Sequence, residues 1–393
     1  MYKSIYLKRG KEESLLRFHP WVFSGAIHHA DAGIQEGDTV RVIASTGDFI
    51  AVGHYQVGSI AVRVLSFSDI TIDQSFWRER LAAAITMRCH IGIADNPENN
   101  TYRLVHGEGD WLPGLVIDCY GSTAVMQAHS VGMHLNRMDI CQALTDVMGG
   151  RIQQVYYKSE TTLPYKAHLE EEDGFIFGHT DDDIAVENGL KFHVDWLRGQ
   201  KTGFFVDQRE NRSLLEHYSK DKTVLNMFCY TGGFSVYAMR GGAKCVHSVD
   251  SSAKAIEITT NNIGLNFPGD PRHEAYCEDA FRFLEEKRNK YDIVVLDPPA
   301  FAKHRAALHN ALKGYIRLNA KGIRLVKEGG LLFTFSCSQA VSKDQFRSAV
   351  FTAAAQSGRK VRIIHQLHQP ADHPINIYHP EGEYLKGLAL YVE

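Results

Sequence analysis

Long apolar runs are missing from this 393-residue sequence. No stretch approaches the roughly 18 consecutive apolar residues that a membrane-spanning helix requires. The first residues also lack the apolar core of a secretory signal. We therefore expect a cytoplasmic protein with no membrane partner. The formal net charge is only −3, which neither favours nor excludes a nucleic-acid partner, because a local basic patch can lie on a nearly neutral chain.

Cysteine is sparse and unpatterned. The seven cysteines are an odd number and form no CxxC pair, which argues against a disulfide framework and against a zinc module. Free thiols are the simpler prediction, and one of them could have a chemical role. The histidines at 365, 368, 373 and 379 cluster near the end but lack a metal-ligand pattern with acids or thiols, so we expect no metal.

The length predicts two or three domains. Residues 1–70 carry short β-branched runs separated by turn signals, which indicates a small β-rich module. Residues 71–190 begin with an amphipathic helix over 73–92 and continue as a mixed α+β region. The acidic runs at 170–173 and 181–183 are typical of solvated loops.

From residue 191 to residue 393, strand and helix patterns alternate. This rhythm predicts an α/β fold in which helices cover both faces of a doubly wound, mainly parallel sheet. The predicted strands are 224–228, 245–250, 273–277, 291–297 and 330–336, with helices between them, and a helix over 343–355 and two further strands complete the chain.

A ligand of such a sheet lies beyond the carboxyl ends of the strands. After the first strand, Phe228-Cys-Tyr230 leads into Gly232 and Gly233, which let the backbone approach a ligand closely. The GxGxxG fingerprint and the Lys-Ser/Thr of a phosphate loop are both missing, so dinucleotides and nucleoside triphosphates are disfavoured. S-adenosylmethionine has no pyrophosphate and needs fewer glycines. A plain tight turn is the alternative explanation.

Three acids follow three successive strands and strengthen this cofactor hypothesis. Asp250 has the spacing of an acid that accepts hydrogen bonds from a ribose, and Asp279 is placed to contact the adenine side. Each acid alone could be a helix cap. The residues from which we expect cofactor contacts at this point are Asn226, Phe228, Tyr230, Gly232, Gly233, Asp250, Asp279 and Asp297.

The same edge of the sheet also offers groups for a target base. Asp297-Pro298-Pro299 leaves the fourth strand as a rigid, extended loop that could brace a base taken out of its stack. Cys337 follows the fifth strand and could attack C6 of a pyrimidine as a thiolate, with Asp297 acting as the acid near N3. The alternatives are a stiff turn and a small buried cysteine.

The N-terminal module mixes cations with aromatic residues, as RNA-binding surfaces do. A solvated basic surface above core aromatics is the alternative. The candidate RNA contacts are Lys8, Arg9, Lys11, Arg17, His19 and Trp21.

Motifs along nearly the whole chain resemble one family. They are His19-Pro-Trp-Val-Phe-Ser-Gly25, Leu112-Pro-Gly114, Lys201-Thr-Gly-Phe-Phe-Val-Asp-Gln-Arg209, Phe228-Cys-Tyr-Thr-Gly-Gly-Phe234, Asp297-Pro-Pro, Thr334-Phe-Ser-Cys-Ser338, Ala371-Asp-His-Pro374 and Tyr384-Leu-Lys-Gly387. The sequence is similar to bacterial large-subunit ribosomal RNA cytosine-5 methyltransferases with an N-terminal PUA domain.

This resemblance implies three parts: a PUA-like RNA-binding domain (1–70), a middle domain (71–190) and a Rossmann-like methyltransferase domain (191–393) that uses S-adenosylmethionine. It implies ribosomal RNA as the partner, Cys337 as the nucleophile and Gln208 against the cofactor. Ala300 departs from the lysine common in the family, which weakens any cationic contact to the target nucleotide there. A homodimer stays open. The rival hypotheses are a methyltransferase acting on a base nitrogen and a non-catalytic RNA-binding protein.

Overall fold

The computed structural model describes residues 2–164, 169, 173–179, 183–285, 290–302 and 304–393. The predicted loops at 170–173 and 181–183 therefore lie mostly outside the described residues. The chain forms two compact units. The first comprises Met1–Gly189, Val194–Val206 and Ala371–Gly382, and the second comprises Leu190–His193, Asp207–Pro370 and Glu383–Glu393.

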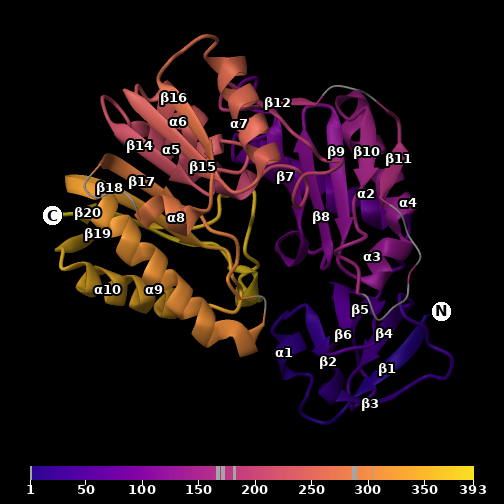
Figure 1. The fold of residues 1–393 in the computed structure, drawn as a ribbon. Coiled ribbons are helices and arrows are strands. Elements are labelled where there is room, and N and C mark those ends of the chain that lie inside the picture. Colours follow the sequence, from indigo (N-terminus) through magenta and orange to yellow (C-terminus); the bar gives the residue numbers. More distant parts are fainter. Residues whose placement is uncertain (1, 165–168, 170–172, 180–182, 286–289, 303) are drawn as a thin grey trace. The chain divides into compact units, whose positions relative to one another are not determined.

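The first unit begins with the expected β-rich module (Figure 1). Its sheet has the order β2-β6-β5-β4-β1-β3 and buries one apolar cluster that includes Ile5, Val42 and Val62. A short helix, α1 (Glu13–Leu16), adds Leu15 to this cluster. The strands are β1 (Lys3–Leu7), β2 (Trp21–Phe23), β3 (Ile27–Ala30), β4 (Thr39–Ile43), β5 (Phe49–Tyr55) and β6 (Ile60–Ser66).

The second part of this unit is an α+β layer. The predicted helix is α2 (Gln74–His90), which begins where the Asp73 carboxylate accepts hydrogen bonds from the backbone N–H groups of Ser75 and Phe76. Its apolar side packs with α4 against a sheet of order β11-β10-β9-β8-β7. The other elements are α3 (Val131–Leu135), α4 (Arg137–Met148), β7 (Thr101–His106), β8 (Leu115–Tyr120), β9 (Thr123–Ala128), β10 (Gln154–Tyr157), β11 (Gly174–Phe177) and β12 (Ile184–Glu187).

The segment Ala371–Gly382 packs within the first unit although its flanks belong to the second. The backbone carbonyl of Asp372 accepts a hydrogen bond from Arg88 at 2.8 Å, and the Asp372 carboxylate accepts one from the backbone N–H of Arg103 at 3.0 Å. The Asn376 side chain donates to the backbone carbonyl of Glu108 at 3.1 Å. These buried polar contacts fix a segment that has no helix or strand longer than one turn.

The second unit is the predicted doubly wound fold. Its seven-stranded sheet has the order β16-β15-β14-β17-β18-β20-β19, in which β16 to β18 are parallel and β20 is antiparallel to both of its neighbours. The seven strands are β14 (Thr223–Met227), β15 (Cys245–Asp250), β16 (His273–Cys277), β17 (Tyr291–Leu296), β18 (Val326–Ser336), β19 (Val361–Leu367) and β20 (Lys386–Val392). The unit also contains β13 (Leu190–His193), which is not part of this sheet.

Strand order explains where the helices lie. The chain moves from β14 outward to β16 and then restarts at β17 on the other side of β14, so right-handed crossovers place the two sets of helices on opposite faces. On one face α5 packs with α6 and α6 with α7, while on the other α9 packs with α8 and α10 (Figure 1). They are α5 (Arg209–Tyr218), α6 (Gly233–Arg240), α7 (Ala253–Asn266), α8 (Ala280–Glu285), α9 (Leu308–Leu325) and α10 (Lys343–Ser357).

The reversal between β14 and β17 is the switch point at which such sheets bind ligands. The predicted bounds of β15 and β16 agree with the structure, whereas β18 starts at Val326, before the predicted Gly330. Its early residue Val326 pairs with Tyr291 ahead of a register irregularity. Within the described residues, every helix is too short or too polar to cross a bilayer.

Candidate active site at the carboxyl edge of the second unit

A strained loop follows β14. Phe228 and Tyr230 have positive φ values of 58° and 46°, which are unusual for residues with a side chain, and Gly232 has φ 79°. A Cβ atom on Gly232 would lie 2.7 Å from Cγ2 of Thr259, so both the backbone angle and the space require glycine. Gly233 begins α6 directly afterwards. The loop therefore presents backbone close to the switch point.

Asp250 fastens this loop at the end of β15. Its Oδ2 accepts a hydrogen bond from the backbone N–H of Tyr230 at 3.0 Å, and its Oδ1 accepts one from Ser252 at 2.9 Å. Each carboxylate oxygen has two lone pairs, so these contacts leave acceptor capacity for a ligand. The side chain is half-buried. Asp250 can thus hold the loop and bind a ribose at the same time.

The other two predicted cofactor residues on this side have local partners. Asp279 is exposed, and its Oδ1 accepts the backbone N–H of Arg282 at 3.0 Å, which is the geometry of a helix cap for α8. Asn226 is fully buried and donates to Oγ of Ser235 at 2.9 Å, inside the layer between β14 and α6. This bond joins β14 to α6 close to the end of the strand, and the cofactor contact of Asn226 stays a prediction.

A buried polar network occupies the end of β17. The side-chain nitrogen of Gln208 donates to Oδ2 of Asp297 at 3.0 Å, and Asn211 donates to the Gln208 carbonyl oxygen at 2.6 Å. Gln208 is only 3% exposed, and Asp297 is half-buried. Pro298 is buried, whereas Pro299 is exposed. Gln208 thereby fixes the orientation of the acid that begins the Asp-Pro-Pro loop.

Cys337 lies immediately after β18. The pairing of Leu296 with Thr334 sets the ends of β17 and β18 side by side, so Asp297 and Cys337 leave neighbouring strands. The Cys337 side chain is half-buried, unlike the fully buried Ser336 and Ser338 that flank it.

Both flanking serines are fixed by hydrogen bonds. Ser336 donates to the Tyr315 hydroxyl at 2.9 Å, and Ser338 donates to the carbonyl of Ala302 at 2.6 Å. Burial raises the pKa of Tyr315 to about 12, and the negative charges of Cys337 and Asp297 add to the effect. The backbone at Cys337 is therefore held rigidly on both sides. The Cys337 sulfur also lies close enough to Tyr315 for its charge to affect the pKa of Tyr315.

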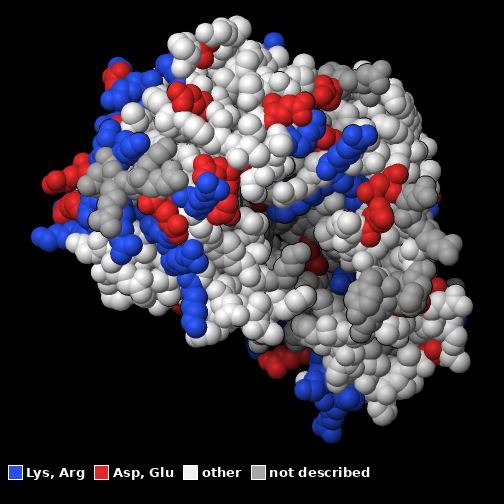
Figure 2. Space-filling model, viewed as in Figure 1, with Lys and Arg blue, Asp and Glu red and all other residues white. Residues whose placement is uncertain are grey.

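The candidate RNA contacts lie in the first unit. Lys8, Arg9, Lys11 and Arg17 are exposed, and Trp21 is half-buried with its Nε1 donating to Glu108 at 2.8 Å. Phe18 and Phe23 beside them are 45% and 46% exposed, so these aromatic residues are not core. Figure 2 shows basic and acidic side chains interspersed on the visible face, with no continuous basic field.

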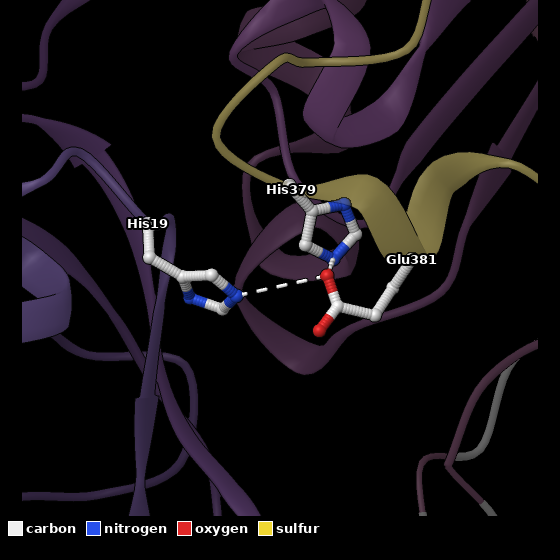
Figure 3. A group of neighbouring side chains, drawn as sticks. All are labelled: His19, His379 and Glu381. Atoms are coloured by element: carbon white, nitrogen blue, oxygen red, sulfur yellow. Dashed lines mark ion pairs between the residues drawn. The ribbon is translucent and has the colours of Figure 1, made fainter.

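Sequence reasoning missed one cluster that includes His19. His19 and His379 both direct Nε2 toward Glu381, each 3.8 Å from Oε2 (Figure 3). His379 is 3% exposed, its ring lies 4.3 Å from that of Trp21, and its two nitrogens lack a hydrogen-bond partner among the described residues. No local spacing connects these residues, so only the fold could reveal the group.

The three side chains offer ligand atoms within 4.8 Å of one another, a separation that could hold a metal ion. However, Nδ1 of His19 accepts the backbone N–H of Trp21 at 3.2 Å, which in the neutral ring places the proton on Nε2. A metal-bound histidine needs the opposite arrangement. His19 and Glu381 therefore form at most an ion-pair contact at 3.8 Å when the ring is protonated, and the absence of a metal stays a prediction.

Comparisons with known proteins agree with the two kinds of module. A family model described as S-adenosylmethionine-dependent methyltransferase matches residues 176–381, and a model of a PUA-like domain matches residues 5–67. Proteins named ribosomal RNA large subunit methyltransferase I from Alteromonas mediterranea and Tolumonas auensis are 40% and 39% identical over 398 positions. These alignments cover 100% and 99% of this chain and 99% of each relative.

Solved structures share the fold. A Streptococcus mutans protein, provisionally named as a SAM-dependent methyltransferase, matches with a TM-score of 0.84 at 21% identity, covering 99% of both chains. A structure of a provisionally named methyltransferase complexed with SAH matches with the same TM-score at 22% identity, also covering 99% of both chains. At such identities the likeness concerns the fold alone.

Proposed function

The chain belongs to the S-adenosylmethionine-dependent methyltransferase family, and we propose that it methylates C5 of a cytosine in large-subunit ribosomal RNA. Its methyl donor is S-adenosylmethionine. Ribosomal RNA as substrate is supported by the names of relatives that are about 40% identical over the whole chain. An enzyme acting on ribosomal RNA is expected to work in the cytoplasm. Cytosine as the base rests on the family resemblance of the sequence motifs.

One observation carries the mechanism: the half-buried Cys337 leaves the sheet beside Asp297. A thiolate at this position attacks C6 of the pyrimidine, and C5 then becomes nucleophilic enough to take the methyl group from the sulfonium. Removal of the C5 proton expels the Cys337 sulfur and restores the aromatic ring. Asp297, oriented by Gln208, contacts N3 in its protonated form and donates its proton there as negative charge develops on the ring.

The loop after β14 would hold the cofactor. Gly232 and Gly233 let this loop pack against the side chains of Thr259 and Arg212, which a Cβ atom at either position would crowd. Asp250 accepts hydrogen bonds from its ribose hydroxyls while holding the loop through Tyr230. Asp279 contributes on the adenine side in addition to capping α8. Asn226 supports the loop by tying β14 to α6 through Ser235.

RNA binding falls to the first unit. The exposed cations Lys8, Arg9, Lys11 and Arg17 bind phosphates, and the partly exposed aromatic residues beside them offer stacking surfaces for unpaired bases. His19 and Trp21 are placed among them, tied to Glu381 and Glu108 respectively.

The test uses cells that lack this protein, complemented with the wild-type chain or with Cys337→Ala. Mass spectrometry of large-subunit ribosomal RNA should find a 5-methylcytosine that returns with the wild type and not with C337A. Cys277→Ala is the matched control, because Cys277 is an exposed thiol at the end of β16 and should restore full methylation. Full activity of C337A, or a methyl group on a base nitrogen, would overturn the C5 mechanism.

A further inference from the structure

Lys386 is a buried cation in an otherwise apolar strand. It is the first residue of β20 (Lys386–Val392), which lies between β18 and β19 in the sheet (Figure 1). Its side chain is only 6% exposed, although lysine is almost never this buried without a specific partner. In the antiparallel pairing with β18, Lys386 stands opposite Ser336, the residue before Cys337. The sheet therefore fixes this ammonium beside the end of β18.

Hydrogen bonds hold the ammonium against the backbone that carries Cys337. Its Nζ donates to the carbonyl of Ser338 at 2.7 Å and to the carbonyl of Tyr384 at 2.6 Å. Ser338 is itself fixed by its bond to Ala302 and is 1% exposed. Two carbonyls satisfy two of the three N–H donors but supply no full negative charge. A positive charge held in this way needs an anion nearby.

The groups that face Lys386 identify that anion. Burial lowers the pKa of Lys386 to about 8, the charges of Cys337 and Glu383 oppose this effect, and Lys343 adds to it. Glu383 is already engaged by Lys343 in an ion pair near the surface. Tyr315, whose pKa is raised in part by the charges of Cys337 and Asp297, supplies no positive charge, and neither does Asp297. Lys386 is thus a buried cation that interacts electrostatically with Cys337 and is bonded to the backbone next to it.

We propose that Lys386 is a positioning residue that keeps Cys337 in its thiolate form by holding an ammonium beside the sulfur. The inference rests on the proposed function, in which Cys337 is the nucleophile. The thiol proton passes to solvent and Lys386 keeps its own proton, so the charge pair forms without a proton transfer between the two residues. A neighbouring cation is a standard means of lowering a thiol pKa. Attack on C6 then consumes the thiolate that Lys386 has stabilised.

The experiment measures thiolate formation separately from methylation. In the full-length protein, the rate at which iodoacetamide labels Cys337 is followed against pH by peptide mass spectrometry. We expect Lys386→Met to move the labelling profile to higher pH and to reduce labelling at pH 7 by about tenfold, the effect of losing one neighbouring opposite charge. The acid limb of kcat/KM should move in the same direction.

The control is Lys343→Met, because Lys343 is an exposed lysine of the same region that pairs with Glu383. It should leave both profiles in place. If K386M fails to fold, Lys386→Gln retains a donor for the carbonyls without the charge and should give the same shift. Thermal melting and S-adenosylmethionine binding establish that a variant is folded.

The outcomes separate this inference from the proposed function. Unchanged labelling and pH profiles in a folded K386M or K386Q protein, together with an inactive C337A, would overturn the role of Lys386 and leave the C5 mechanism standing. An active C337A protein would overturn the C5 mechanism, even if K386M shifts the pH profile of Cys337 labelling.

Discussion

The side-chain amide of Gln208 donates a hydrogen bond to the carboxylate of Asp297 across 3.0 Å, joining the residue before α5 to the end of β17. Asn211 holds the other end of the Gln208 amide at 2.6 Å, so the amide cannot rotate without losing a bond. A hydrogen bond to a charged group in a buried place is stronger than a neutral one. This chain of three side chains fixes the acid at the rim of the sheet.

Loss of the Gln208 amide should therefore misplace Asp297. We expect Gln208→Ala to lower kcat/KM for methylation by roughly ten- to a hundredfold, because a hydrogen bond to a charged group contributes about 1.5–3 kcal/mol. Gln356→Ala, at an exposed position in α10, should leave activity unchanged. Equal activity of Q208A and Q356A would mean that Asp297 acts without the hydrogen bond from Gln208.

Asp250 should determine cofactor affinity in two ways, through the ribose and through the loop at Tyr230. We expect Asp250→Ala to weaken S-adenosylmethionine binding by at least about tenfold in calorimetry, because a charged acceptor is lost. Asp250→Asn keeps one acceptor oxygen and should lose less. Asp344→Ala removes an exposed acid from the first turn of α10 and serves as the control. Unaltered affinity in D250A would rule out the ribose contact.

Gly232 should tolerate no side chain. We expect Gly232→Ala to cost about 1–3 kcal/mol of unfolding free energy, because alanine is strained at φ 79° and its Cβ would meet Thr259. Gly264→Ala is the matched comparison, since it lies in α7 with open space around it and should be neutral or slightly stabilising. Urea titrations of both variants measure the difference. A G232A protein as stable as G264A would contradict the steric argument.

Acid should destabilise the first unit before its carboxylates titrate. Burial, assisted by nearby positive charges, lowers the pKa of His54 and of His129 to about 4. In the unfolded chain both titrate near 6.5, so the unfolded state binds more protons between these values. The two neutral histidines therefore make their whole contribution to the unfolding free energy above pH 6.5. This contribution decreases as the pH drops to 4, by roughly 3 kcal/mol per histidine.

Denaturant unfolding at several pH values tests this expectation. His54→Gln should remove part of the slope between pH 6.5 and 4, whatever its effect on stability at pH 8. His28→Gln, at an exposed position in β3, should retain the whole slope. If the three proteins show the same pH dependence, the buried His54 ring is not the cause.

The sequence by itself determined the local elements and the fold class. Strands and helices are recognised from apolar residues that recur two to four positions apart in the sequence. The bounds of β15 and β16 could therefore be predicted to the residue, and the loop at Gly232 could be assigned to the end of a strand. The same rule, that parallel strands end at one edge, makes Cys337 and Asp297 candidates for one site, whereas the role of Cys337 as nucleophile is what the family resemblance implies.

Only the tertiary structure decided which distant side chains meet. Asn226 turned inward to Ser235, His19 met Glu381, and Lys386 came to lie beside the end of β18. Ala371–Gly382 joined the first unit through the buried contacts of Asp372. Such contacts depend on the register and packing of elements far apart in the chain, and a pattern with a period of a few residues carries no information about them.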